Sequence, residues 1–258
     1  MKTVCIMNLK GGVAKTATTI NMAAILAGDY DQRVLVIDAD SQCNTTEFFG
    51  GEPEQGSLAL LLRAAGVTDW TGHGLIQKSN FPGVDLLCGS EELMDLDLSA
   101  VSSDSSRAMA LVKLRDHLES WDAYDWCIVD CPPAFNGASA AALLAADEVI
   151  IPIKLDAFSI RGMVNLHRQV ANMQTLNPDL RLAGYLRTMW YDSGTIREAD
   201  AALEESGMPV FRSKIRRSDK VDAMTFAQTP LTVFSPRSGA GVDYRRFVRE
   251  YLEVHHGI

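Results

Sequence analysis

The sequence predicts an α/β fold in which helices flank both faces of a doubly wound, mostly parallel sheet. Short apolar runs alternate with longer amphipathic stretches along the 258 residues, as expected for repeated strand–helix units. Four of the runs are almost continuously apolar, which is typical of strands buried on both faces of a parallel sheet. Lysine, glycine and aspartate follow three of the runs, at the carboxyl ends where such sheets bind their ligands.

Seven strands are predicted, and the first, second, fourth and fifth are the apolar runs. In chain order they cover residues 3–8, 33–38, 84–88, 126–130, 148–153, 182–189 and 210–211. Six helices are predicted from the amphipathic stretches, over residues 15–27, 106–119, 137–145, 159–173, 197–205 and 242–255. No linker, repeat or low-complexity tract interrupts this alternation, so residues 1–258 are expected to form a single domain.

The composition excludes several classes of protein. With 47% hydrophobic and 22% charged residues, the chain is neither disordered nor a collagen or disulfide scaffold. No apolar run approaches the ~18 residues of a membrane span, and the start of the chain is too polar for a signal peptide. The five cysteines lie in or beside apolar segments, which indicates reduced core thiols rather than a metal centre. A cytoplasmic location is therefore expected.

The net charge of −9 argues on average against nucleic acid as a partner. The charge is unevenly distributed, however. Residues 212–249 contain nine basic and only three acidic residues, which leaves the rest of the chain strongly acidic. This basic C-terminal region is either a solvated face or a binding surface for an anionic partner.

A loop at residues 10–16 follows the first predicted strand and opens the first helix. Paired glycines, Gly11 and Gly12, allow backbone N–H groups to turn inward as an anion nest, and the helix directs its positive end at the same point. Lys15 would reach the terminal phosphates of a nucleotide, and the hydroxyl of Thr16 would ligate Mg²⁺. Ala14 stands where the plain phosphate-loop pattern has glycine, so a glycine-rich turn that binds nothing is the alternative.

Acidic residues follow two other apolar runs. Asp130 stands where a carboxylate holds the Mg²⁺ shell of a nucleotide site. Asp38 and Asp40 are two residues apart and could project to the same face of an extended segment, one towards the metal and the other towards the attacking water. The alternative for any one of these aspartates is a turn or a helix cap.

These motifs together resemble the ParA/MinD class of ATPases. Residues 10–16 (KGGVAKT) are similar to its deviant Walker A motif, which is marked by an extra lysine, here Lys10. Residues 38–44 (DADSQCN) resemble its D-x-D-P-Q-x-N stretch, and residues 129–133 (VDCPP) its Walker B motif. Residues 151–153, 186–189 and 236–240 resemble landmarks of the ParA branch, in its short, Soj-like form without an N-terminal DNA-reading domain.

The resemblance implies a weak Mg²⁺-dependent ATPase that forms a homodimer with two ATP molecules sandwiched between the subunits. Lys10 would cross to the partner's phosphates and neutralise the transferred phosphoryl group, as an arginine finger does. Lys15 would hold the β- and γ-phosphates, and Asp40 would position the water. Thr16, Asp130 and Asp38 would surround the Mg²⁺. The ATP-binding loop implied by the motif consists of Lys10, Gly11, Gly12, Val13, Ala14, Lys15, Thr16 and Ala17.

Three residues depart from the family pattern and put the turnover rate in doubt. Ala14 replaces a usual glycine, which works only if its backbone needs no positive φ. Ala17 replaces a common threonine that could touch the α-phosphate. Ser41 replaces the usual proline after Asp40, so this segment is expected to be looser.

The resemblance also implies that the ATP dimer binds non-specific DNA and acts with a ParB-like centromere-binding protein on the nucleoid. The best candidates for the DNA contacts are Arg217, Lys220 and Arg237, with Arg245, Arg246 and Arg249 expected on the outer face of the last helix. Three alternatives stay open: a MinD-like positioning ATPase, a redox ATPase for which Cys131 is the only hint, and a slow ATP-binding regulator. The apolar stripe of the last helix is expected to pack on the domain, and no membrane anchor is expected.

Overall fold

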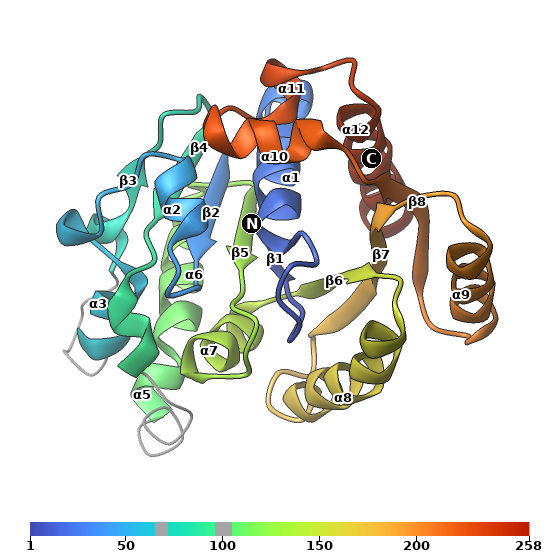
Figure 1. The fold of residues 1–258 in the computed structure, drawn as a ribbon. Coiled ribbons are helices and arrows are strands. Elements are labelled where there is room, and N and C mark those ends of the chain that lie inside the picture. The colour runs from blue at the N-terminus through green and yellow to red at the C-terminus, as the bar shows by residue number, and fades with distance from the viewer. Residues whose placement is uncertain (65–71, 96–104, 258) are drawn as a thin grey trace.

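Figure 1 shows the computed structural model, which describes residues 1–64, 72–95 and 105–257. A sheet of eight strands has the order β3-β4-β2-β5-β1-β6-β7-β8. All neighbouring strands are parallel except β3, which pairs antiparallel with β4. The predicted fold class is confirmed. The strands are β1 Lys2–Ile6, β2 Val34–Asp38, β3 Gln77–Lys78, β4 Val84–Leu87, β5 Trp126–Asp130, β6 Glu148–Lys154, β7 Arg181–Trp190 and β8 Val210–Arg216.

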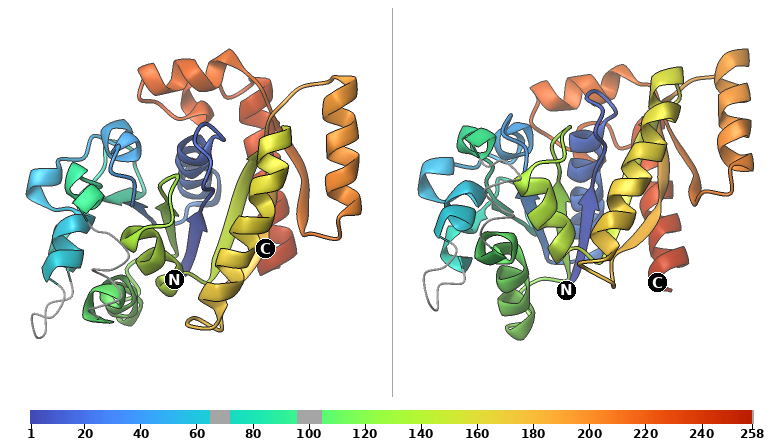
Figure 2. Two further views of the ribbon diagram at one scale, coloured as in Figure 1. Left: turned by 60° about the horizontal axis from the view of Figure 1, so that its bottom comes forward. Right: turned by 90° about the horizontal axis from the view of Figure 1, so that it is seen from below.

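Helices connect the strands and cover both faces of the sheet. The described α-helices are α1 Lys15–Tyr30, α2 Asn44–Phe48, α3 Leu58–Ala64, α5 Ser105–Ala108, α6 Ala110–Ser120, α7 Gly137–Ala145, α8 Ala157–Gln174, α9 Gly194–Glu205, α10 Asp219–Phe226, α11 Leu231–Phe234 and α12 Gly239–His256. Short 3₁₀ turns lie at Pro53–Gln55, His73–Leu75 and Glu91–Asp95. In the turned views of Figure 2, α8 lies on one side of the strands and α12 on the other.

The alternation of side chains along each strand produces two apolar cores, one on each face of the sheet. In β1 and the residue after it, Val4 and Ile6 belong to the core beneath α1 and α12, whereas Cys5 and Met7 belong to the core beneath α6, α7 and α8. This double burial explains why the central strands are continuous apolar runs. The apolar stripe predicted for the last helix lies in the first of these cores, with Tyr244, Phe247, Val248 and Leu252 all buried.

The structure extends some predicted elements and adds others. Strand β8 runs to Arg216, whereas the prediction ended it at residue 211. Its second half, in which Arg212 is exposed and Ile215 is buried, contains no apolar run, so the sequence pattern gave no signal for it. Helices α2, α3, α10 and α11 were not predicted, and each has eight residues or fewer. Such short helices are fixed by their packing rather than by local periodicity. In the described part of the chain, no helix combines the length and apolarity needed to cross a membrane.

Candidate active site

The glycine-rich loop lies at the carboxyl edge of the sheet, between the end of β1 and the start of α1. The amino end of α1 has no side-chain cap and no acidic residue in its first turn, so its free N–H groups can bind an anion. Gly12 has a φ of 68°, and no other atom lies within 4 Å of the place where its Cβ would be. The loop therefore leaves open space beside a positive helix end.

Ala14 corrects an expectation from the sequence. Its φ of 64° lies in the left-handed region, so this position does require a conformation that favours glycine. An alanine there costs about 1–2 kcal/mol relative to an ordinary conformation. The phosphate-binding turn is retained, and the substitution is accommodated as local strain.

Lys15 is buried at the first turn of α1. Its ammonium group donates to the carbonyl oxygen of Lys10 over 3.1 Å and has no ion pair in the described structure. Burial lowers the pKa of Lys15, although Asp130 and Asp40 oppose this shift. The site thus holds a cation that an incoming anion would stabilise.

Asp130 lies at the end of β5, beneath the loop. Its Oδ2 accepts hydrogen bonds from the hydroxyls of Thr16 at 2.7 Å and Thr45 at 2.6 Å. Its Oδ1 is buried and has no hydrogen-bond partner among the described residues. Burial raises the pKa of this carboxyl to about 6, against the opposing effect of the two hydroxyl donors. Sequence reasoning missed Thr45, which is 85 positions from Asp130.

Asp38 and Asp40 have different environments. Asp38 is fully buried, and its Oδ2 accepts hydrogen bonds from the N–H and the hydroxyl of Thr46, both at 2.8 Å. Its Oδ1 accepts from the N–H of Asp40 at 3.1 Å. Burial, and then the nearby Asp130, raises the pKa of Asp38 to about 7. The half-buried Asp40 faces the cleft instead, and its Oδ1 accepts from the N–H of Gln42 at 3.0 Å.

Lys10 points away from the loop. Its ammonium group lies 2.7 and 2.6 Å from the two carboxylate oxygens of Asp156, which follows β6. Both side chains are about one-third exposed, at 36% and 29%. In the isolated chain the extra lysine of the motif is therefore held in an intramolecular ion pair. Asp156 carries no motif, and its position after an apolar run was the only signal in the sequence.

A cleft of about 680 Å³ opens above the loop, which is large enough for a nucleotide. The motif residues that line it are Gly11, Gly12, Ala14, Lys15, Thr16, Ala17, Asp40, Gln42, Asn44 and Pro133. Val13 is buried beside them, and its carbonyl accepts from the hydroxyl of Thr188. Helices α2 and α10 form the walls, and the side chain of Gln228 bridges them by donating to the carbonyl of Glu47 at 3.2 Å.

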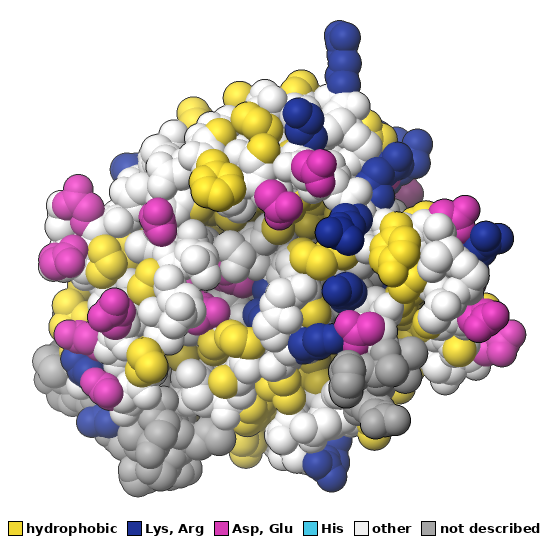
Figure 3. Space-filling view, in the orientation of Figure 1, with side chains coloured by type: hydrophobic (Ala, Val, Ile, Leu, Met, Phe, Trp, Pro, Cys, Tyr) yellow, Lys and Arg dark blue, Asp and Glu magenta, His cyan; other side chains and the backbone are white. Residues whose placement is uncertain are grey.

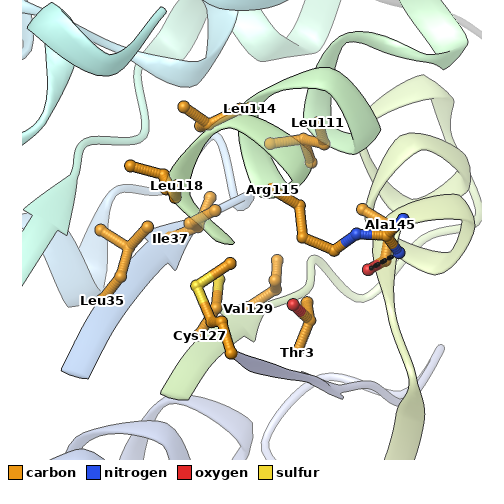
Figure 4. A pocket seen from close by; sticks show the side chains of 11 residues that line it. Thr3, Leu35, Ile37, Leu111, Leu114, Arg115, Leu118, Cys127, Val129 and Ala145 are labelled. Carbon is orange, nitrogen blue, oxygen red and sulfur yellow. Dashed lines mark hydrogen bonds between the residues drawn. The ribbon is translucent and has the colours of Figure 1, made fainter. Parts of the chain in front are cut away.

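A second, much smaller pocket lies between α6 and the face of the sheet formed by β1, β2 and β5 (Figure 4). Apolar side chains line most of it, and the guanidinium of Arg115 is turned to the carbonyl of Ala145 at 3.1 Å. Its volume of about 10 Å³ is close to that of a single water. This pocket is therefore too small for a nucleotide.

The basic C-terminal region is only partly available to a ligand. Salt bridges within the chain occupy three of its members: Lys214 with Asp200, Arg216 with Asp243, and Arg245 with Asp29. The backbone N–H of Arg212 donates to Glu250 at 2.6 Å. Arg217, Lys220 and Arg237 are exposed and have no ion-pair partner among the described residues. Figure 3 shows Lys and Arg side chains in a band beside α10, on its right, whereas acidic side chains gather over α2 and α3.

Fold and site together define a nucleotide-binding protein of the P-loop class, with its phosphate loop between the first strand and first helix. A family model described as an AAA domain matches residues 1–182. The chromosome partitioning protein ParA of Caulobacter vibrioides is 30% identical over 98% of this chain and 94% of its own length. The chain therefore belongs to the ParA family of partition ATPases.

Solved structures agree with this assignment. Apo McdA from Cyanothece has a TM-score of 0.84 at 24% identity, covering 98% of this chain and 99% of its own, which shows the fold. Cobyrinic acid a,c-diamide synthase from Mycobacterium smegmatis, with bound ATP analogue and magnesium, has a TM-score of 0.79 at 25% identity over 98% of this chain and 95% of its own. The family is that of partitioning and positioning ATPases.

Proposed function

We propose that the chain is a DNA-partitioning switch: a weak Mg²⁺-dependent ATPase that dimerises on binding ATP and holds non-specific DNA as the dimer. The observation that carries this proposal is the arrangement of Lys15, Thr16 and Asp130 at the uncapped amino end of α1. Lys15 and Thr16 line a cleft of about 680 Å³, and the carboxylate of Asp130 lies beneath them, 2.7 Å from the Thr16 hydroxyl.

The residues present fit ATP and Mg²⁺. The unpartnered Oδ1 of Asp130 and the hydroxyl of Thr16 are oxygen donors of the kind that Mg²⁺ prefers. The described residues contain no group of three acidic, His or Cys ligands, so phosphate and water oxygens would complete the shell. Bound Mg²⁺ supplies positive charge that neutralises the phosphate oxygens during transfer. Lys15 would hold the β- and γ-phosphates.

Asp38 and Asp40 receive separate roles in this proposal. Asp40 lines the cleft and would position the attacking water. Asp38 is enclosed by Thr46 and the backbone of Asp40, so we assign it the positioning of this loop around the Mg²⁺ site rather than direct coordination. The ionised form of Asp38 is disfavoured by burial, which fits a residue that acts through its neighbours.

Lys10 would act across the dimer. Its ion pair with Asp156 is partly exposed and therefore worth little in water, about 0–1 kcal/mol. A γ-phosphate presented by the partner subunit would compete with Asp156 for the same ammonium group. We propose that Lys10 leaves Asp156 when two ATP-loaded subunits meet, which links occupancy of the site to dimerisation.

DNA binding is assigned to Arg217, Lys220 and Arg237. Arg217 follows β8 directly and also lines a cavity of about 290 Å³ that shares Ala14 with the nucleotide cleft. Dimerisation would double the number of these cations on one particle, and each neutralised phosphate releases counterions. The relationship to ParA supports a ParB-like partner and a place on the nucleoid.

The test is retention of a non-specific DNA fragment at low salt with ATP, ADP or no nucleotide, comparing the natural chain with Lys10→Ala. We expect salt-sensitive retention with ATP alone, and its loss in the variant. A protein that binds ATP but retains DNA under none of the three conditions would contradict a DNA-partitioning role. That result would point to a membrane or protein target.

A slow ATP-binding regulator is the second candidate, because the left-handed Ala14 strains the phosphate loop. Measuring phosphate release from the DNA-bound protein distinguishes the two candidate functions. Repeated turnovers would support the partitioning switch, and stably bound ATP without turnover would support the slow regulator.

A further inference from the structure

A side chain of strand β7 holds the phosphate loop, residues 10–16, from outside the loop. Thr188 lies near the carboxyl end of β7 and is 1% exposed. Its hydroxyl donates to the carbonyl oxygen of Val13 at 3.0 Å, across 175 positions of the sequence. Strand β6 lies between β1 and β7 in the sheet. The hydrogen bond therefore attaches the loop to a strand that is not a neighbour of β1, the strand that leads into the loop.

This hydrogen bond fixes the direction of the next N–H group. In a planar trans peptide unit the carbonyl and the N–H point in opposite directions. Because the carbonyl of Val13 is directed at the buried Thr188, the N–H of Ala14 is directed to the other side. Ala14 lines the nucleotide cleft, and its N–H has no hydrogen-bond partner among the described residues. That N–H is therefore free to bind an anion in the cleft.

Ala14 needs support from outside because its backbone is strained. Its φ of 64° and ψ of 34° lie in the left-handed region, which an alanine adopts at a cost. A strained residue keeps its conformation only where the surrounding contacts determine it. The hydroxyl of Thr18 donates to the carbonyl of Ala14 at 2.7 Å, but Thr18 belongs to the helix that follows the loop. Thr188 supplies the corresponding contact on the side of Val13, from a separate strand.

We propose that Thr188 is a positioning residue for nucleotide binding. Its hydroxyl holds the Val13–Ala14 peptide in the orientation that presents the N–H of Ala14 to a phosphate group. The hydroxyl does not touch the nucleotide and acts through the loop. Without it, Ala14 can relax out of the left-handed region, which turns the peptide and withdraws the N–H from the phosphate. The inference rests on the nucleotide-binding part of the proposed function and requires neither DNA binding nor dimerisation.

The test compares two substitutions at position 188. Thr188→Val keeps the shape of the side chain without the hydroxyl, and Thr188→Ser keeps the hydroxyl without the methyl group. Titration with a fluorescent ATP analogue and Mg²⁺ measures nucleotide affinity, and urea denaturation measures stability. We expect Thr188→Val to bind the analogue about tenfold more weakly, as for one lost hydrogen bond. Thr188→Ser should keep the natural affinity although the loss of a buried methyl group lowers its urea midpoint.

The matched control is Thr19→Val, which makes the same change at another buried threonine. Thr19 is 0% exposed, and its hydroxyl has no hydrogen-bond partner among the described residues. Removing this hydroxyl therefore leaves no described carbonyl without its donor. We expect Thr19→Val to bind the analogue with the affinity of the natural chain.

A second comparison places Thr188→Val in an Ala14→Gly background. Glycine adopts the left-handed conformation without strain, so the loop should keep its orientation when the hydroxyl is absent. We expect Thr188→Val to weaken binding by less than about threefold in this background. The comparison of Ala14→Gly with Ala14→Gly/Thr188→Val also decides the proposal if Thr188→Val alone does not fold.

Natural affinity in Thr188→Val, equal weakening in Thr188→Ser, or an undiminished loss in the Ala14→Gly background would each overturn the proposal. So would a loss in Thr19→Val as large as that in Thr188→Val. DNA retention measured on the same samples keeps this proposal distinct from the proposed function. A natural chain that binds the analogue but never retains DNA would contradict the partitioning role alone, and the affinities of the variants would still decide the role of Thr188.

Discussion

Ala14 shows how a single residue can be adapted to a site at a cost in stability. Its left-handed backbone turns the chain from the glycine loop into α1, where glycine would adopt the same conformation without a Cβ penalty. Glycine is more flexible in the unfolded chain, which offsets part of the gain. The net balance still favours glycine at this position.

We therefore expect Ala14→Gly to raise the free energy of unfolding by about 0.5–1 kcal/mol. The control is Ala17→Gly, three residues further along inside α1, which should lower it by about the same amount. Urea denaturation monitored by circular dichroism measures both. A destabilised Ala14→Gly variant would show that the left-handed backbone is not strained.

Asp38 and Asp130 make the stability of the nucleotide-free protein depend on pH. Their pKa values of about 7 and about 6 exceed the ordinary value of 3.8 because both carboxyls are buried. Between about pH 4 and 7 the folded state therefore retains protons that the unfolded state has lost. Stability from these groups is greatest at the acidic end of this window and falls as the pH rises through it.

The slope from each group is up to about 1.4 kcal/mol per pH unit. We expect Asp38→Asn, which cannot titrate, to have a flatter dependence on pH than the natural chain between about pH 5 and 7. Urea denaturation in a series of buffers without nucleotide gives the comparison. Parallel curves for the two proteins would mean that Asp38 is already ionised in the folded state.

At the scale of elements, helix α9 is attached to the edge of the sheet by a buried guanidinium. Arg187 on β7 is 1% exposed and pairs with two carboxylates of α9, those of Asp200 and Glu204, both at 2.5 Å. Burial raises the pKa of Asp200, but hydrogen bonds from Lys214 and Arg187 outweigh it and hold the pKa below its ordinary value. The two carboxylates differ in exposure, at 6% and 57%.

This difference predicts unequal costs on the same helix. We expect Asp200→Ala to lower the free energy of unfolding by about 3 kcal/mol, because it leaves the buried Arg187 without its enclosed partner. Glu204→Ala should cost less than about 1 kcal/mol, since an exposed pair is screened by water. Thermal and urea denaturation measure the loss in free energy of unfolding for each variant. Equal losses in the two variants would contradict the prediction.

At the scale of the whole molecule, charge is separated into an acidic side over α2 and α3 and a basic band beside α10 (Figure 3). The overall charge of −9 conceals this separation. If the chain binds nucleic acid as proposed, the overall charge would repel it and the basic band would attract it, so the charge pattern would set the orientation of binding.

We expect Arg217→Glu to abolish ATP-dependent DNA retention while ATP binding persists, because it reverses the charge of an exposed side chain next to the nucleotide cleft. Arg249→Glu is the control, since Arg249 is also exposed, on the outer face of α12. A filter assay on plasmid DNA and a fluorescent ATP analogue measure the two properties. Retention by Arg217→Glu at the level of the control would remove this residue from the DNA surface.

Local patterns determined the fold class and the centre of the site. Apolar runs without alternation specify strands buried on both faces, and glycines followed by Lys15 and Thr16 specify a phosphate loop wherever a strand leads into a helix. Asp130 could be proposed as a site residue in the same way, because it stands at the end of an apolar run. These features depend on neighbours within a few positions along the chain.

Only the tertiary structure decided the rest. The ion pair of Lys10 with Asp156, separated by 146 positions, and the hydrogen bond of Thr45 to Asp130 require the strand order that places these loops side by side. The sequence pattern did not predict the left-handed backbone of Ala14 either, nor that α10 forms a wall of the cleft. Such features arise from long-range packing, which overrides local propensity and leaves no periodic signal in the sequence.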